Sequence, residues 1–290
     1  MTAAPGIADA RLDTAALSLA VDLFRSRTVL VSGGGSGIGK AIAWMFGRLG
    51  ASVALCGRSA DRLAPVEAAM RARGWPVLAC PTDIRDEISV AALFDRVDKQ
   101  FGAIDFLINN AGGQYPQAAI DVKPKGWRAV VETNLTGTWQ MMQVAAQRWV
   151  AAHRGGTIIN ITAANVRGMP GIIHSSAARA GIANASRTAA VEWAPHGIRI
   201  NCVAPGLIDS GGLSTYSDSA RAGFYRANPQ RALGDPWDVA QLVGFLASDA
   251  AKFITGTTIE MDGGGSLWGD LWTIERPAEF GDESRLSREP

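Results

Sequence analysis

The glycine-rich stretch from Gly33 to Gly39 is the feature of this sequence that most constrains its fold. It follows an apolar run at 28–32 and precedes apolar residues at helical spacing at 41–46. This order indicates a strand, a tight turn and a helix. Glycines let the backbone turn sharply and let a phosphate approach the N–H groups at the positive end of the helix. The stretch therefore predicts a pyrophosphate cradle formed by Ser32, Gly33, Gly35, Ser36, Gly37, Ile38 and Gly39.

The spacing is looser than the strict dinucleotide fingerprint G-x-G-x-x-G, so a glycine turn that only packs closely is the alternative. Beyond it, apolar segments that indicate strands alternate with longer helical stretches. We predict strands at 28–32, 52–56, 77–81, 106–109, 156–161, 198–203 and 257–261. Strands that are apolar on both faces and separated by helices form parallel, doubly wound sheets, whose ligands bind beyond the carboxyl ends of the strands.

We therefore predict an α/β chain with one Rossmann-type, doubly wound parallel sheet of about seven strands. The dinucleotide-binding catalytic domain is expected at 28–265, between an N-terminal arm at 1–27 and a C-terminal tail at 266–290. The first dozen residues are expected to be loose, and residues 15–24 to form a short helix. A chain of 290 residues is long enough to bury one substantial core.

Composition argues against several function classes. The 28 basic and 27 acidic side chains leave a net charge of +1, which favours neither nucleic acid nor a membrane surface as a partner. The chain lacks an apolar run of bilayer length and a secretory signal, so we expect a cytoplasmic protein. Cys56, Cys80 and Cys202 are widely separated and fall in predicted strands, which favours buried, reduced thiols over a disulfide or a metal site.

The residues after the second predicted strand bear on the choice of cofactor. An NAD enzyme commonly carries an acidic residue there for the ribose hydroxyls, and this chain has none. Arg58, with Arg62 one helical turn later, is suited to a 2′-phosphate because a guanidinium fork matches phosphate geometry. We expect NADP(H) to be preferred, with NAD(H) possible; the alternative is a solvated pair of arginines.

Further motifs resemble the short-chain dehydrogenase/reductases. They are Ser32-Gly33-x3-Gly37-Ile38-Gly39, Asp83, 109–112, Asn134, 201–206, 254–256 and 262–264. The resemblance implies the Rossmann-type fold, a nicotinamide dinucleotide and a homotetramer. It places Asp83 and Ile84 at the adenine, Asn110 and Ala111 at the ribose, Ile208 at the nicotinamide carboxamide and Ser210 near the pyrophosphate, with Gly112, Pro205 and Gly206 also at the cofactor.

The chain departs from that family where a Tyr-x3-Lys pair is normally found. Arg179 falls in the lysine position and Ser175 in the tyrosine position. The family's serine falls on Thr162 by spacing and on Ala163 by motif. A narrower resemblance, to peroxisomal trans-2-enoyl-CoA reductases and more loosely to 2,4-dienoyl-CoA reductases, is carried by segments 109–114, 125–138, 174–181 and 197–206. These are atypical members without the tyrosine.

Reduction of an enoyl thioester sends hydride to Cβ, and the charge that develops on the thioester oxygen needs donors. Ser175 and Arg179 lie four residues apart, on one face of a helix that starts near His174. Arg179 is expected to bond the nicotinamide ribose and to supply positive charge, and Ser175 or Thr162 to donate to the oxygen. Asn134, which interrupts a long helical pattern at 127–153, is expected to kink that helix and to hold a water that relays the proton.

His174 is the third candidate near the helix start, as a proton donor or substrate contact; the alternative is a helix cap. Segment 209–231 follows a strand and predicts a lid over the cleft, whose apolar residues suit an acyl chain. The preferred hypothesis is an NADPH-dependent reductase of an acyl-CoA-like, trans-2-enoyl thioester. The alternatives are a 3-oxoacyl or hydroxysteroid-type carbonyl reductase and a catalytically silent scaffold that binds the cofactor.

Overall fold

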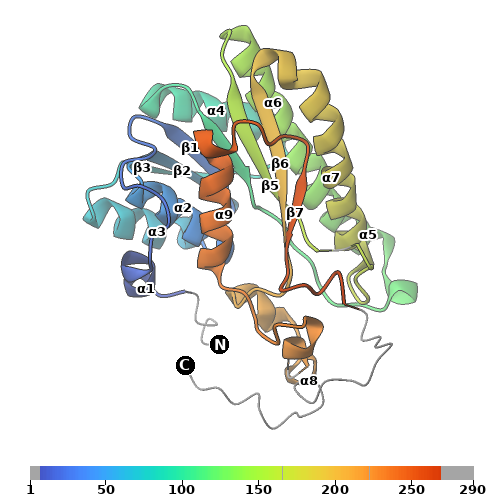
Figure 1. Cartoon of the computed structure of the whole chain (residues 1–290). Coiled ribbons are helices and arrows are strands. Elements are labelled where there is room, and N and C mark those ends of the chain that lie inside the picture. The colour runs from blue at the N-terminus through green and yellow to red at the C-terminus, as the bar shows by residue number, and fades with distance from the viewer. Residues whose placement is uncertain (1–6, 165, 222, 269–290) are drawn as a thin grey trace.

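The computed structural model describes residues 7–164, 166–221 and 223–268. Its centre is a seven-stranded sheet in the order β3-β2-β1-β4-β5-β6-β7, with every neighbouring pair parallel (Figure 1). The strands are β1 (Thr28–Ser32), β2 (Ser52–Gly57), β3 (Val77–Pro81), β4 (Phe106–Asn109), β5 (Gly156–Ile161), β6 (Ile198–Pro205) and β7 (Thr258–Met261). The predicted doubly wound α/β fold is confirmed, and the strand bounds agree with the sequence pattern to within two residues.

Helices cover both faces of the sheet. One face carries α2 (Gly37–Arg48), α3 (Ala60–Ala72) and α9 (Pro236–Ala247), and the other carries α4 (Glu87–Phe101), α6 (Gly137–Ala151) and α7 (Ile173–Trp193). Each layer is closed by large, fully buried side chains, such as Trp44 and Phe46 from α2 and Phe94 from α4. Because both faces are covered, the strands are apolar throughout, and this is the pattern that identified them.

The strand register brings the carboxyl ends to one level. Ser32, the last residue of β1, pairs with Cys56 on β2 and with Asn109 on β4, and Asn109 pairs with Asn160 on β5. The chain builds outward from β1 to β3 and then crosses to β4 on the other side of β1. Ligands of such sheets bind at this change of direction. The site is therefore expected beyond the ends of β1 and β4.

The helical pattern around Asn134 is interrupted as the sequence indicated. Helix α5 (Pro124–Val131) passes into a π-helical turn, Glu132–Thr136, which leads into α6. Asn134 is buried at the centre of this turn. A π-turn displaces the residues that follow it, and such turns are frequent at functional sites. The predicted interruption of the helical pattern at Asn134 is confirmed.

The N-terminal segment differs from expectation. Helix α1 (Asp9–Thr14) lies earlier than the helix expected at 15–24, where the chain forms bends and turns. Leu12 is fully buried against the core, and the Asp13 carboxylate accepts a hydrogen bond from Trp44 Nε1 at 2.9 Å and pairs with Arg73. These tertiary contacts, which no local period signals, fix residues that the sequence suggested were loose. Residues 1–6 of the expected arm and 269–290 of the expected tail lie outside the described residues.

Three smaller findings concern membranes, metals and thiols. Within 7–164, 166–221 and 223–268, no helix is long and apolar enough to cross a bilayer. The same residues contain no group of three or more His, Cys, Asp or Glu side chains that could hold a metal ion. Cys56, Cys80 and Cys202 are free and buried in β2, β3 and β6. Burial raises the pKa of each thiol, which keeps these cysteines protonated and unreactive.

Candidate active site

The glycine turn between β1 and α2 has the form of an anion-binding cradle. Gly33 has φ +68, a left-handed conformation that favours glycine, and a Cβ on Gly39 would collide with the Gly33 carbonyl oxygen. Ser36, the residue that caps α2, is exposed and makes no side-chain capping bond, and the first turn of α2 has no acidic residue. The N–H groups and the positive end of α2 thus lack an internal anion. This cradle fits a dinucleotide pyrophosphate.

A hydrogen-bonded latch joins the end of β1 to the end of β4. Ser32 Oγ accepts from the backbone N–H of Asn110 at 3.1 Å and of Ala111 at 3.0 Å. In return, Asn110 Nδ2 donates to the carbonyl oxygens of Ser32 at 3.1 Å and Gly33 at 3.3 Å. The Asn110 side chain holds the glycine turn, and the position of this residue at the ribose stays a prediction. Its contribution to a cofactor site is to fix the shape of the cradle.

The residues expected around the adenine and the 2′-phosphate have different environments. Arg58 is exposed directly after β2, as a phosphate contact requires. Asp83 is bound by Arg85, with Nε 2.9 Å and Nη2 2.5 Å from its carboxylate, and this guanidinium lowers the pKa of Asp83. The Ile84 side chain is 4% exposed and packs into the core against Gly137, so only its backbone remains for a nucleotide.

On the opposite side of the cradle, the segment after β6 approaches the glycine turn. A Cβ on Gly37 would lie 3.5 Å from Ser210 Cβ, so Ser210 lies beside the predicted pyrophosphate site. Ile208 is buried and forms a parallel bridge with Gly234. Pro205 and Gly206 close the end of β6: the Pro205 carbonyl accepts from Ala164 N at 3.0 Å, and Gly206 N donates to Met261 O at 2.9 Å. All four lie at the carboxyl edge of the sheet.

His174 lies in the first turn of α7 and its side chain is completely buried. Its Nδ1 accepts a hydrogen bond from Ser175 N at 2.7 Å, and its ring meets that of Tyr115 edge-on at a centroid distance of 4.5 Å. Desolvation lowers the pKa of the imidazole below its ordinary value. His174 is therefore a neutral, buried residue of the first turn of α7, and its Nε2 has no hydrogen-bond partner among the described residues. Its role as proton donor or as helix cap stays a prediction.

A chain of polar side chains runs from Asn134 to Tyr216. Asn134 holds Gly113 with two hydrogen bonds, from Gly113 N to Oδ1 and from Nδ2 to Gly113 O, each 2.9 Å. Nδ2 also donates to Ser175 Oγ at 3.3 Å, and Ser175 Oγ donates to Gln114 Oε1 at 2.9 Å. Gln114 Nε2 then donates to the Tyr216 hydroxyl at 2.6 Å. Both donors of the Asn134 amide, which we expected to hold a water, are engaged by protein.

Arg179 brings positive charge to the ends of β4 and β5. Its Nη1 donates to the carbonyl oxygen of Ile161, and a Cβ on Gly112 would collide with its Nη2. Desolvation lowers the pKa of the guanidinium to about 10, so Arg179 remains charged at neutral pH. The absence of a side chain at Gly112 is what leaves room for the guanidinium.

Thr162 is oriented differently from expectation. Its hydroxyl donates to the Val203 carbonyl at 3.1 Å, and the residue is 6% exposed. The pairing of β5 with β6 continues beyond Ile161 through Thr162, whose N–H also bonds Val203 O at 2.7 Å. The side chain therefore completes this strand pairing and is not presented to the cleft as a donor.

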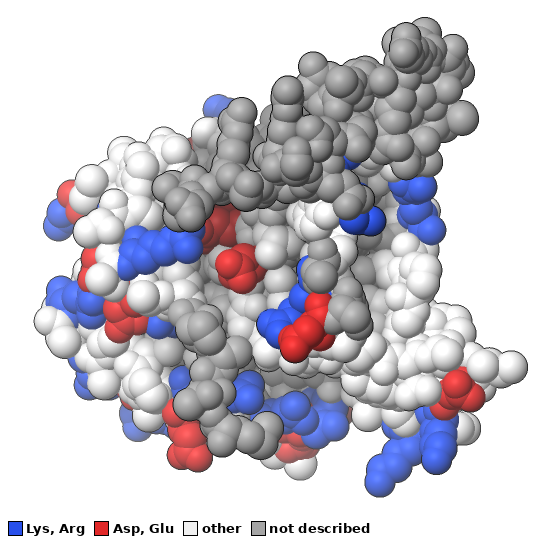
Figure 2. Space-filling model, turned by 90° about the horizontal axis from the view of Figure 1, so that it is seen from below, with Lys and Arg blue, Asp and Glu red and all other residues white. Residues whose placement is uncertain are grey.

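The segment after β6 covers the carboxyl edge of the sheet. It contains the short helices Gly211–Thr215, α8 (Asp218–Arg221) and Phe224–Ala227, which lie below the strands in Figure 1. Tyr216 packs edge-on against Phe224 at a centroid distance of 5.3 Å and reaches Gln114 beneath. Figure 2 views this edge from below and shows basic and acidic side chains interspersed around a central hollow. The placement is that of the predicted lid.

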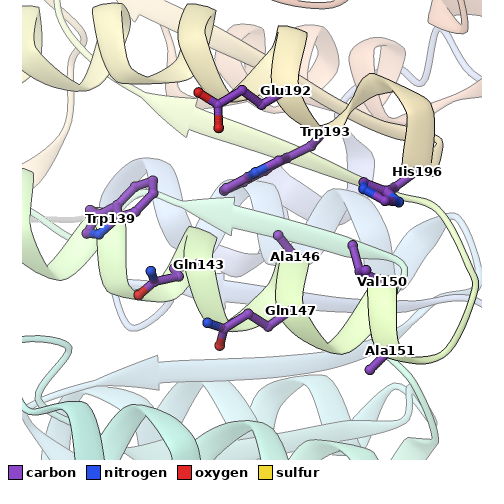
Figure 3. A pocket seen from close by; sticks show the side chains of 9 residues that line it. All are labelled: Trp139, Gln143, Ala146, Gln147, Val150, Ala151, Glu192, Trp193 and His196. Atoms are coloured by element: carbon purple, nitrogen blue, oxygen red, sulfur yellow. The ribbon is translucent and has the colours of Figure 1, made fainter.

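A second hollow lies away from this edge, between α6 and α7 (Figure 3). It has a volume of about 540 Å³. Its walls include the stacked rings of Trp139 and Trp193, with centroids 6.1 Å apart, and the side chains of Val150 and His196. None of the predicted catalytic or cofactor residues lines it. The candidate active site is therefore the edge with the glycine turn, Arg179 and the Asn134 to Tyr216 chain.

Two members of this site were not predicted in their observed roles. Gln114 appeared only as part of a matching motif, and Tyr216 only as an apolar residue of the lid. They lie 102 residues apart in the sequence, and their hydrogen bond depends on the lid crossing back over β4. No local pattern signals such a contact. The motif around Gln114 was the one available indication.

Comparison with known proteins supports an oxidoreductase site. Residues 33–266 match a family model described as enoyl-(acyl carrier protein) reductase. A probable 2,4-dienoyl-CoA reductase from Bacillus subtilis is 37% identical over 82% of this chain and 96% of its own length. The cis-4-hydroxycyclohexanecarboxylate dehydrogenase of Sinomonas cyclohexanicum is 39% identical over 84% of this chain and 98% of its own length.

A solved structure supports the fold assignment. A short-chain dehydrogenase from Bacillus anthracis superposes with a TM-score of 0.80 at 34% sequence identity, covering 85% of this chain and 99% of its own. The shared fold therefore covers most of this chain and nearly all of the other.

Proposed function

Because the chain belongs to the short-chain dehydrogenase/reductase family, we propose that it is an NADPH-dependent reductase of the C=C bond of an enoyl thioester, with a trans-2-enoyl-CoA-like substrate. The observation that carries this proposal is the start of α7. Ser175 and Arg179 stand where the family's tyrosine and lysine normally stand, and the Ser175 hydroxyl is bonded internally to Gln114. That position offers no acid for an alkoxide.

The cofactor is proposed to bind along the carboxyl edge of the sheet. The N–H groups of the glycine turn and the first turn of α2 would hold the pyrophosphate, and the exposed Arg58 would pair with the 2′-phosphate of NADP(H). The family uses NAD(P)(H), and a reduced nicotinamide supplies hydride when bound. NAD(H) remains the second choice at the same cradle.

Arg179 is proposed to stabilise the negative charge that develops on the thioester oxygen. Its guanidinium lies between Gly112 and Ile161 in a poorly solvated position. A fixed charge in such surroundings acts more strongly than in water. It needs no proton transfer to do so, which suits a reaction that passes through an enolate.

The relatives support two reaction types. The B. subtilis protein is named for reduction at a carbon–carbon double bond, in agreement with the proposal. The S. cyclohexanicum protein is named for oxidation of a hydroxyl group. A 3-oxoacyl or hydroxysteroid-type carbonyl reductase is therefore the second candidate.

One assay panel separates the candidates. Purified protein with NADPH or NADH is mixed with crotonyl-CoA, longer 2-enoyl-CoAs, a 2,4-dienoyl-CoA, acetoacetyl-CoA and a decalone, and absorbance of the reduced cofactor is followed. Oxidation of NADPH with enoyl thioesters is expected. Turnover of the ketones alone would replace the proposal by the second candidate, and tight NADPH binding without any turnover would favour a silent scaffold.

We propose that the protein assembles as a homotetramer through the outer faces of α6 and α7. These helices expose Val191, Val150 and Trp139, with 77%, 36% and 37% of their surfaces accessible. Neighbouring apolar side chains exposed to water favour contact with another protein surface, here a second copy of this chain. Light scattering on the wild type and a Val191→Glu variant tests this, and a monomeric wild type would contradict it.

A further inference from the structure

We propose that Tyr216, carried by the lid segment after β6, is the proton donor of the active site and that Gln114 is its positioning residue. The inference rests on the proposed reductase function and adds to it the group that completes the reaction. Every hydroxyl and amide that the sequence offered for this role is bonded within the protein.

The expected donors are engaged elsewhere. The Ser175 hydroxyl donates to Gln114 Oε1, and the Thr162 hydroxyl donates to Val203 O. Both donors of the Asn134 amide are bonded, to Gly113 O and Ser175 Oγ. In this arrangement none of the three presents a proton to a substrate. Breaking one of these bonds would leave a buried polar group unsatisfied, which is unfavourable.

Tyr216 stands at the open end of the same chain and differs from these groups. Its oxygen accepts a hydrogen bond from Gln114 Nε2 at 2.6 Å, and its own O–H has no acceptor among the described residues. The ring is held edge-on against Phe224, which limits its rotation. Gln114 accepts a hydrogen bond from Ser175 and donates one to Tyr216. These bonds orient the phenol and leave its proton for a ligand.

The electrostatics keep the phenol protonated. Burial raises the pKa of Tyr216, and the hydrogen bond from Gln114 partly offsets this shift by stabilising the phenolate. The acid form therefore persists throughout the physiological range. A raised pKa does not impair the role, because an enolate is a far stronger base than a phenolate and withdraws the proton readily.

The proposed step is balanced. A bound reduced nicotinamide would supply hydride to Cβ, and the electron pair of the double bond would move toward the thioester to give an enolate. The O–H bond of Tyr216 then breaks as a new C–H bond forms at Cα. The phenolate recovers its proton from water. The net change adds one hydride and one proton across the double bond.

The first test compares Tyr216→Phe with Tyr115→Phe in the full-length protein. Both changes remove one phenolic hydroxyl, and Tyr115 is the neighbour of Gln114 whose ring packs on His174. Loss of a positioned acid lowers kcat about a hundredfold or more. Tyr216→Phe should show this loss with crotonyl-CoA while binding NADPH as tightly as wild type, measured by fluorescence. Tyr115→Phe should retain wild-type turnover.

The second test does not depend on turnover. Phenolate absorbance is titrated against pH in the free protein, and the transition missing from Tyr216→Phe identifies Tyr216. In Gln114→Leu this transition should move to higher pH, because burial remains while the stabilising hydrogen bond is lost. In Gln114→Glu the added negative charge should move it higher still. An unmoved transition in both variants would overturn the positioning role of Gln114.

The outcomes distinguish this proposal from the reductase function. A wild type that reduces enoyl thioesters, with Tyr216→Phe equally active, overturns the assignment of Tyr216 alone. The same result with an inactive Ser175→Ala would return the role to Ser175. A wild type inactive on every thioester overturns the reductase function, yet the titration still reports whether Gln114 holds Tyr216.

Discussion

The glycine turn and the start of α7 border the same site and are built in different ways. At the turn, Ser32 and Asn110 bond backbone groups next to one another, and the cradle takes its shape from neighbouring strand ends. At α7, Ser175 donates to Gln114, which lies in the segment after β4, and Gln114 donates in turn to Tyr216 of the lid. The cofactor side is a local construction, whereas the reacting side is assembled from three distant segments.

This difference explains why one side retains the family pattern and the other departs from it. A pyrophosphate needs N–H groups at a fixed turn, and few sequences provide that geometry. A proton donor needs only a hydroxyl in the right place, which different elements of a fold can supply. The comparison predicts that changes at α7 impair chemistry and changes at the turn impair cofactor binding and stability.

The largest effect is expected from Arg179→Met, which removes the fixed charge on the reacting side. Loss of one such electrostatic contact lowers kcat about a hundred- to thousandfold. Arg187→Met is the matched control because Arg187 is exposed two turns later on α7. Steady-state kinetics with an enoyl-CoA measure the loss. A variant that loses NADPH affinity but keeps kcat would move Arg179 to the cofactor side.

Ser32→Ala tests the local construction of the cofactor side. Two N–H groups, of Asn110 and Ala111, would lose their common acceptor in a buried position. The expected loss in the free energy of unfolding is about 1–3 kcal/mol. Ser32→Thr keeps the hydroxyl and should recover most of it. Denaturant unfolding provides the measurement, and equal stability of wild type and Ser32→Ala would refute the latch.

Arg58→Asp examines cofactor choice without touching the reacting side. Removing a charged contact to the 2′-phosphate should weaken NADPH binding on the order of tenfold. NADH lacks that phosphate, so its affinity should change little. Fluorescence titration with both cofactors gives the ratio. Equal losses of both affinities would show that Arg58 does not recognise the 2′-phosphate, and the NADP(H) preference would then be wrong.

The smallest effect is expected from His174→Gln, and it appears as a change in pH dependence. Burial lowers the pKa of His174 in the folded protein, so the unfolded chain takes up a proton first as the pH falls below about 6.5. The neutral form of His174 therefore contributes to the free energy of unfolding above that pH, and this contribution is lost as the pH falls toward the pKa of the folded state. His174→Gln removes this contribution, so the free energy of unfolding should fall less steeply between pH 7 and pH 5 than in the wild type. Denaturant unfolding at several pH values measures this.

The sequence predicted the sheet well for a physical reason. Strands buried on both faces must be continuously apolar, and β1, β3, β4 and β5 could be bounded directly from that pattern. The glycine turn and the interruption at Asn134 were also found because each needs a particular residue type at one place. The short helix α1 was misplaced because its position depends on Leu12 and Asp13 meeting the core.

The candidate site likewise has features that the sequence predicted and features that it did not. The sequence by itself determined the phosphate cradle, the position of Arg179 and the absence of the usual tyrosine and lysine, since each is a matter of residue type and spacing. Only the tertiary structure decided the hydrogen-bond partners in the site. Asn110 donates to Gly33 O, Thr162 donates to Val203 O and Ser175 donates to Gln114 Oε1. Tyr216 enters the site because the lid folds back against the segment after β4, a contact between residues far apart in the chain that spacing along the sequence does not encode.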